Sequence, residues 1–171
     1  MKRAARGFSA LELLFVVLIV GTLMVVLLER VAYYQEFAEK DAMERVAGEI
    51  RWALRIRAAE LMLANRSEEM GRLETANPLE ALELRVPDFA GVGNNAGEAS
   101  VAPGHWYYNR ESRELAYFPR FTANFVKEPS ARARVAWRVV VIREAPRPGA
   151  PPRPVWVRFE ASGTARWLEQ R

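Results

Sequence analysis

The feature that most constrains this chain is a run without charge near its start. From Leu13 to Leu28 the sequence carries 16 residues with no charged side chain. Extended back to Phe8, the apolar segment would form a helix about 31 Å long, enough to cross one bilayer. We therefore predict a single membrane-spanning helix over residues 8–28.

Charges on either side of this run predict its orientation. Three cations precede it and acids follow it: Lys2, Arg3 and Arg6 before, Glu29, Glu36 and Glu39 after. Cations favour the cytoplasmic side, so the N-terminus is expected there and the remainder outside. The same cations explain the basic pI, because the chain from residue 8 onward holds 22 basic and 21 acidic residues.

An ordinary secretory signal peptide or an uncleaved anchor shares the basic start and the apolar middle. A signal peptide is cut after the apolar run, between small residues. Here that region reads Leu28-Glu29-Arg30-Val31-Ala32, with Arg30 where the first small residue should be. The small residue stands instead at Gly7, before the apolar run.

The sequence around Gly7 resembles the class III signal of the type IV pilin family. A short basic leader ends in Gly7, Phe8 follows, and Glu12 would be the fifth residue of the mature chain inside an apolar helix. The family includes major and minor pilins and the pseudopilins of type II secretion. Gly21 also matches a glycine common in these helices.

The resemblance implies a processing and assembly route. A prepilin peptidase/methyltransferase would cleave between Gly7 and Phe8 in the bacterial inner membrane and N-methylate Phe8. Glu12 would occupy the family's assembly position. The expected partners are other pilin or pseudopilin subunits and an inner-membrane assembly platform. The expected product is a periplasmic or cell-surface filament of a type IV pilus or type II secretion machine.

Glu12 is unusual on physical grounds alone. A carboxylate in hydrocarbon is costly unless it finds a partner, so intramembrane acids are functional candidates. Cleavage would create a positive amine on Phe8, which a neighbouring subunit's Glu12 would neutralise. The alternative is a carboxylate that only reaches toward the headgroups, since Glu12 is one turn from the helix start.

The remaining sequence predicts an α+β fold. No proline occurs between Phe8 and Met70, and apolar residues continue at helical spacing, so a helix is expected from Phe8 to about Asn65. Residues 29–70 then form an amphipathic helix of the headgroup. Residues 71–171 are expected to form an antiparallel β-sheet against it.

Alternating patterns mark the expected strands. They cover 82–86, a hairpin of 105–109 with 115–118, and residues 135–142 and 155–159, the last returning toward 166–168. Residues 91–104 are expected to form a flexible loop. The proline-rich residues 145–154 are expected to connect two strands, although such a segment is also suited to partner binding.

Catalytic and metal-binding patterns are sparse. His105 is the only histidine, and the two aspartates, Asp41 and Asp88, are far apart in the sequence. We predict no enzymatic activity, no cofactor and no metal site. The chain also has no cysteine. Lacking both an acidic loop and a cysteine pair, it resembles a minor subunit more than a major one.

Charge is divided unevenly along the chain. Residues 29–100 hold 14 acids and 9 bases, whereas residues 131–171 hold 9 arginines and 3 glutamates. The primary prediction is a structural filament subunit. The alternative is a DNA-binding minor pilin of an uptake system, whose phosphate contacts would come from the C-terminal arginines. These are Arg132, Arg134, Arg138, Arg158 and Arg166.

Overall fold

The long N-terminal helix predicted from the sequence is present. The structure is a computed structural model that describes residues 9–126, 132–147, 149–163 and 165–167. Helix α1 runs from Ala10 to Leu63, within two residues of both expected ends. The chain divides into two compact units, residues 1–38 and residues 39–171, the second of which we call the headgroup unit.

Short helical segments and strands follow α1. The helical segments are η1 (Ser67–Glu69), α2 (Met70–Leu73), α3 (Pro78–Ala81) and α4 (Asn95–Glu98). The strands are β1 (Phe89–Gly93), β2 (His105–Asn109), β3 (Glu114–Phe118), β4 (Phe125–Val126), β5 (Val135–Glu144), β6 (Arg153–Ser162) and β7 (Arg166–Trp167). This order confirms the α+β class.

The main sheet has five strands in the order β1-β2-β3-β5-β6. The predicted β2–β3 hairpin is confirmed, with His105 opposite Phe118 and Asn109 opposite Glu114. The proline-rich segment connects β5 to β6, as expected, and these two strands pair antiparallel. The sheet is mixed, however, because β1 pairs parallel with β2.

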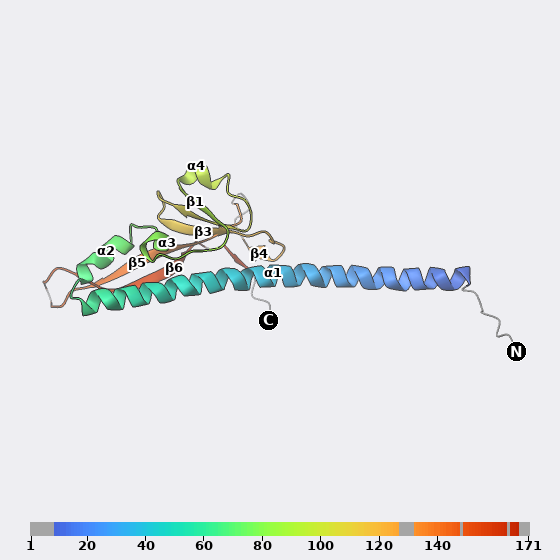
Figure 1. Cartoon of the computed structure of the whole chain (residues 1–171), viewed down its shortest axis with the longest axis horizontal. Helices are drawn as coiled ribbons and strands as arrows, with labels where there is room; N and C mark the ends of the chain where they lie inside the picture. Colours follow the sequence, from blue (N-terminus) through green and yellow to red (C-terminus); the bar gives the residue numbers. More distant parts are fainter. Residues whose placement is uncertain (1–8, 127–131, 148, 164, 168–171) are drawn as a thin grey trace. The chain divides into compact units, whose positions relative to one another are not determined.

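One core joins α1 to one face of this sheet. The headgroup part of α1 contributes a buried stripe, and the sheet contributes alternating aromatic and β-branched side chains. The helical members are Met43, Ala47, Ile50, Leu54, Ala58 and Leu61, and the sheet members include Trp106, Tyr108, Leu115, Trp137, Val139 and Phe159. A smaller cluster on the opposite face contains Val101, Tyr107, Ala116, Phe118 and Ala136. Helix α4 lies on this second face, across the sheet from α1 (Figure 1).

The predicted strand over residues 82–86 is wrong. Asn77 caps α3 by accepting a hydrogen bond from Leu79 N at 3.1 Å, with Pro78 at the first helical position. Glu83 then adopts a left-handed conformation, with φ of 54°, which interrupts an extended backbone. Leu82, Leu84 and Val86 still pack against the core. Their alternation therefore reflects burial of an irregular segment.

Two further expectations differ from the structure. Residues 91–104 are not simply a loop, because β1 ends within them and α4 lies inside them. Strand β7 pairs with β4, through Phe125 opposite Trp167, instead of returning to β6. The two rings pack edge to face with centroids 5.0 Å apart. This aromatic contact holds the second, two-stranded sheet together.

Candidate functional site

The N-terminal end of α1 carries the predicted assembly residue. Ser9 Oγ accepts a hydrogen bond from Leu11 N at 3.2 Å and so caps the helix. Glu12 lies in the first turn, where the helix dipole favours a negative charge, and it is exposed. Ser9 and Glu12 have the spacing of a capping box. Among the residues that the structure describes, none forms an ion pair with Glu12.

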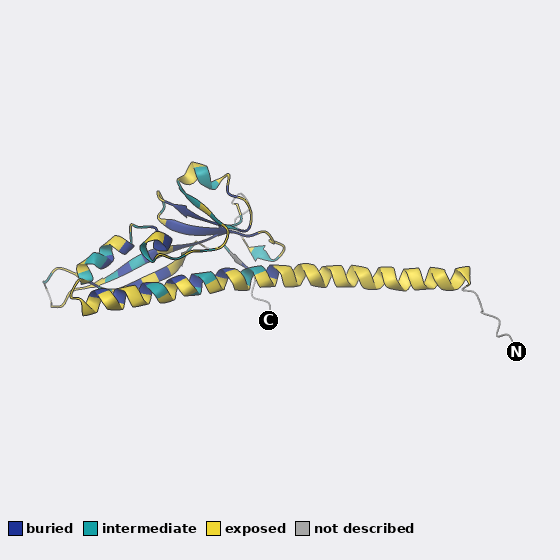
Figure 2. Cartoon of the chain, viewed as in Figure 1, coloured by how far each residue is buried: buried dark blue, intermediate teal, exposed yellow. Residues whose placement is uncertain are grey.

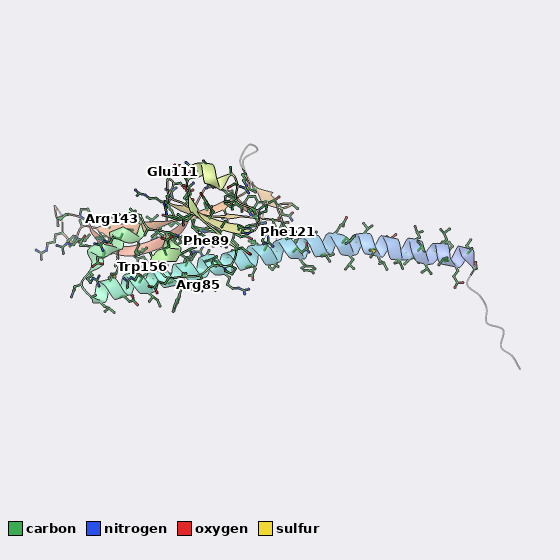
Figure 3. All side chains as sticks on the ribbon, turned by 45° about the horizontal axis from the view of Figure 1, so that its top comes forward. Arg85, Phe89, Glu111, Phe121, Arg143 and Trp156 are labelled. Carbon is green, nitrogen blue, oxygen red and sulfur yellow. The ribbon has the colours of Figure 1, made fainter. Side chains whose placement is uncertain are left out.

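The segment after Glu12 is apolar and exposed on every side. Each residue from Leu13 to Leu28 is exposed, and side chains stand out all around this part of α1 (Figure 3). Thr22 is the polar exception, and its hydroxyl donates to Leu18 O at 2.9 Å. α1 is the one helix of the described residues that is long and apolar enough to cross a membrane. This segment is therefore suited to a lipid or protein environment instead of water.

A half-buried polar contact ties α1 to the sheet at Glu39, the first residue of the headgroup unit. Glu39 Oε1 accepts from Tyr117 Oη at 2.7 Å and from Arg120 N at 2.8 Å, and its Oε2 accepts from Phe121 N at 2.9 Å. Burial and the neighbouring Glu39 carboxylate raise the pKa of Tyr117, which therefore remains a hydrogen-bond donor at neutral pH. The contact fixes where the chain leaves β3.

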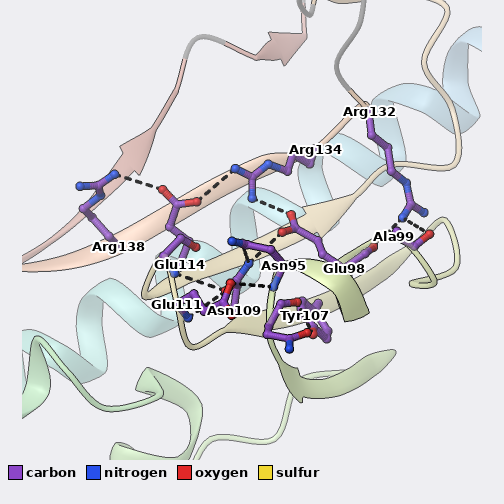
Figure 4. A network of polar contacts seen from close by, with 12 residues as sticks. Asn95, Glu98, Ala99, Tyr107, Asn109, Glu111, Glu114, Arg132, Arg134 and Arg138 are labelled. Atoms are coloured by element: carbon purple, nitrogen blue, oxygen red, sulfur yellow. Dashed lines mark hydrogen bonds and ion pairs between the residues drawn. The ribbon is translucent and has the colours of Figure 1, made fainter.

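A second polar network covers the far face of the sheet, and Asn109 organises half of it (Figure 4). Asn109 is completely buried at the end of β2. Its Oδ1 accepts from Glu111 N at 2.9 Å, which shapes the hairpin turn. Its Nδ2 donates to Asn95 Oδ1 at 2.6 Å and to Glu98 Oε2 at 2.9 Å. One side chain thus holds both the β2–β3 turn and α4 in place.

The other half of the network is a chain of alternating charges. Arg134 on the segment entering β5 donates to Glu98 Oε1 at 2.6 Å and to Glu114 Oε2 at 3.2 Å. Arg138 donates to Glu114 Oε1 at 3.1 Å. Burial would raise the pKa of Glu114, but hydrogen bonds and the two arginine charges outweigh it and hold that pKa below its ordinary value. Two arginines and two glutamates therefore neutralise one another.

The other arginines of the DNA-binding hypothesis have different surroundings. Arg132 donates to three carbonyl oxygens, those of Glu98, Ala99 and Val101, and its guanidinium lies 4.4 Å from the centroid of the Phe118 ring. Arg158 Nη1 lies 3.4 Å from Glu160 Oε1. The Arg166 side chain lies outside what the structure describes. The structure thus brings Arg132, Arg134 and Arg138 together, but around protein acceptors, so a DNA phosphate would have to displace those acceptors.

Small residues around Tyr107 explain the composition of the segment predicted as flexible. The Tyr107 hydroxyl donates to Asn94 O at 2.9 Å. A Cβ added at Gly93 or at Gly97 would clash with that hydroxyl. Both glycines thus allow α4 to approach the sheet closely, and the segment is packed.

An open cleft of about 810 Å³ lies beside α4. It is lined by Phe89, Val92, Ser100, His105, Tyr107 and Arg110, among others. His105 Nδ1 lies 3.1 Å from Pro103 O, so the single histidine interacts with its own loop. Within the described ranges, no three His, Cys, Asp or Glu side chains gather as a metal site would require.

The predicted cleavage site falls outside the described residues. Gly7 and Phe8 precede the first described residue, so cleavage between them and N-methylation of Phe8 stay predictions. Sequence reasoning missed Glu39, Asn109 and Glu114 as organising residues. Asn109 carried a signal, because an asparagine directly before a turn often hydrogen-bonds the backbone two residues on. The other two depend on pairing between distant segments, which no local pattern records.

No protein-family model, no curated protein and no solved structure matches this chain. What this molecule does must therefore be inferred from its own residues.

Proposed function

We propose that this chain is a pilin-like structural subunit, anchored in the bacterial inner membrane by the N-terminal part of α1. It is processed after Gly7 and then polymerises into a filament of a type IV pilus or type II secretion machine, as a minor subunit. Its task is assembly, and it performs no catalysis. The apolar segment stores the subunit in the membrane and later forms the core of the filament.

The observation that carries this proposal is the exposed apolar segment with Glu12 in its first turn. Every residue from Leu13 to Leu28 is exposed in a single chain, so the segment needs an apolar environment that other molecules supply. The core of the headgroup unit, in contrast, consists of residues between Met43 and Trp167. The headgroup therefore does not require the apolar segment for its own packing.

Glu12 gives the polymer its register. Cleavage after Gly7 leaves a positive amine on Phe8, and in a stack of parallel subunits this amine meets the Glu12 carboxylate of a neighbour. Both groups are already removed from water, so pairing relieves two unfavourable charges at once. Removing one partner leaves the other charge buried and uncompensated. The pairing therefore favours one axial offset between subunits.

The proposal also assigns the partners and the location. Positive charges before the apolar segment keep the N-terminus in the cytoplasm, where a prepilin peptidase/methyltransferase acts. The headgroup lies in the periplasm and then on the filament. The other partners are further pilin or pseudopilin subunits and the inner-membrane assembly platform.

The test is to replace Glu12 by leucine and to use Glu29→Leu as the matched control. Both glutamates are exposed on α1, but Glu29 follows the apolar segment. We expect Glu12→Leu to be cleaved after Gly7 and inserted in the membrane normally, yet to enter sheared or cross-linked filaments poorly. Glu29→Leu should assemble much as the original chain does.

Two outcomes would contradict the proposal. Normal filament incorporation of Glu12→Leu would mean that the carboxylate only reaches the headgroups. An N-terminus near Ala32, determined by mass measurement of the mature protein, would mean ordinary signal-peptide cleavage. A Gly7→Val variant should remain an uncut precursor, and its normal processing would likewise exclude cleavage at this position.

A further inference from the structure

An apolar stripe on the headgroup part of α1 is left uncovered. Trp52 is 64%, Ile56 39% and Leu63 86% exposed, and Ala59 is also exposed. These four residues, which we call the outer stripe, follow one another at intervals of four, three and four residues. At about 3.6 residues per turn they lie along one line of the helix.

The outer stripe faces away from the sheet. The buried face of α1 contains Ile50, Leu54 and Leu61, which are half a turn removed from the stripe on the helix circumference. Figure 2 shows the two faces of this part of α1 as alternating buried and exposed residues. The sheet therefore does not cover the stripe, although Leu82 and Glu83 line a groove along one edge of it.

Gly48 lies one turn before Trp52 on the same side of the helix. A Cβ added to Gly48 would meet no atom within 4 Å. Glycine inside a helix costs about 1 kcal/mol relative to alanine, so this chain's own packing gives no reason for it. A close approach by another helix would give one.

Charges beside the outer stripe indicate which kind of helix would bind there. The 4-3-4 spacing places the stripe at the a and d positions of a heptad, and then Arg55 takes position g and Glu60 takes position e of the next heptad. In a parallel, in-register pair of identical helices, g of one chain faces the following e of the other. The Arg55 of each copy would therefore meet the Glu60 of the other copy, which gives two such contacts. In an antiparallel pair, like charges would meet.

Both charged groups are accessible for such contacts. Glu60 Oε2 accepts from Arg57 of its own chain at 3.0 Å, which leaves Oε1 for a second donor. Arg55 is exposed and, within the residues described, forms no ion pair. A shallow groove on the Glu60 side is also lined by Glu83 and by Arg57, so the surface that would receive Arg55 has two acids and one base.

We propose that the outer stripe docks against the outer stripe of a second copy, as a parallel, in-register helix pair that forms outside the membrane while both chains are anchored in it, before filament assembly. The proposal rests on the membrane anchoring of the proposed function, because two chains that enter one membrane in the same orientation are held parallel. Anchoring also raises their effective concentration, so a short stripe suffices.

Cysteine cross-linking tests this directly, because the chain contains no cysteine. Full-length Ala59→Cys places a thiol on the stripe, and full-length Ala64→Cys places one away from the stripe, at the exposed residue that directly follows α1. Membranes from a host without filament machinery are oxidised and examined for disulfide-linked dimers. We expect Ala59→Cys to form at least about fivefold more dimer than Ala64→Cys.

A charge exchange tests the orientation. In the Ala59→Cys background, Arg55→Glu should lower the dimer yield several-fold, because Glu would then face Glu60. Adding Glu60→Arg should restore the dimer yield, because residues 55 and 60 then carry opposite charges again, with the signs exchanged. Restoration also excludes misfolding as the cause of the loss.

Two results would overturn the proposal. Equal cross-linking of Ala59→Cys and Ala64→Cys would exclude the stripe as the contact. Dimerisation that is insensitive to Arg55→Glu would exclude charge-directed parallel pairing. Neither result depends on cleavage at Gly7 or on Glu12, so failure of the pair and failure of filament assembly would be distinguished.

Discussion

The two ends of α1 have the same secondary structure but different surroundings. Residues 13–28 are apolar and exposed on all sides, whereas residues 43–61 bury one face against the sheet. In Figure 2 the first part is uniformly exposed, and the second alternates. A helix that is apolar all round requires an apolar environment, while an amphipathic helix requires a partner on one side only. One uninterrupted helix therefore combines a segment that requires an apolar environment with a segment that packs within the headgroup.

Charged side chains differ between the two ends in the same way. The headgroup part carries ion pairs along its exposed side, including Arg45 with Asp41 at 2.9 Å and Arg57 with Glu60 at 3.0 Å. Exposed pairs of this kind contribute little stability. These charged side chains keep the exposed side of the headgroup part of α1 soluble in water, and the apolar segment has no such side chains. The distribution of charge thus separates the part of α1 made for water from the part that is not.

The largest expected difference is in the response to cavity formation. Leu54 is 1% and Leu18 is 64% exposed. We expect Leu54→Ala to lower the free energy of unfolding of the headgroup by about 2–5 kcal/mol, because a buried cavity remains. Leu18→Ala should change it by less than about 0.5 kcal/mol.

Tryptophan fluorescence during denaturation in detergent measures this difference. All five tryptophans lie between residues 52 and 167, so the signal reports on the headgroup alone. If Leu18→Ala destabilised the headgroup as much as Leu54→Ala does, the two ends of α1 would not be energetically separate.

An intermediate effect is expected from the charge network around the buried Glu114. Glu114→Gln should lower headgroup stability by about 1–3 kcal/mol at pH 7, because Arg134 and Arg138 lose their charged acceptor. The folded pKa of Glu114 is depressed, so its stabilisation is present above the unfolded pKa, about 4.3, and is lost as pH falls through that value toward the folded pKa.

The measurement is the stability difference between the original chain and Glu114→Gln from pH 7 to pH 3. The difference should shrink as the pH falls. Glu144→Gln is the control, since Glu144 is exposed at the end of β5. A difference that stays constant with pH would mean that charge at Glu114 does not stabilise the fold.

The smallest expected effect concerns DNA. Because Arg132, Arg134 and Arg138 are engaged by protein acceptors, the headgroup should bind duplex DNA weakly, and binding should disappear between low and physiological salt. Arg132→Ala with Arg134→Ala should change stability more than DNA affinity. Fluorescence anisotropy with a labelled DNA duplex measures the DNA affinity. Tight, salt-resistant binding that the double variant abolishes would support the DNA-binding alternative.

The sequence predicted those parts of the fold that depend on local pattern. The extent of α1 followed from apolar periodicity without proline, and the β2–β3 hairpin followed from two aromatic runs around a polar turn. The pairing of β7 with β4 was not predictable, because it depends on contact between Phe125 and Trp167, far apart in the sequence. Gly93 and Gly97 suggested flexibility, although they make room for one tyrosine hydroxyl.

The candidate site divides in the same way. Glu12 could be predicted as a site residue because an acid in an apolar run is a local signal, and its role in assembly stays a prediction. The roles of Arg134 and Arg138 were not readable, since their partners Glu98 and Glu114 come from other segments. Counting arginines near the C-terminus therefore overestimated the positive charge that the folded surface presents.

The contact at Glu39 has a mechanical consequence. Within the headgroup unit, its carboxylate joins α1 to the segment that follows β3, because Tyr117 and the backbone of Arg120 and Phe121 all donate to it. A force that pulls α1 away from this segment would load all three hydrogen bonds. Glu39 would therefore resist such a separation in addition to the hydrophobic core.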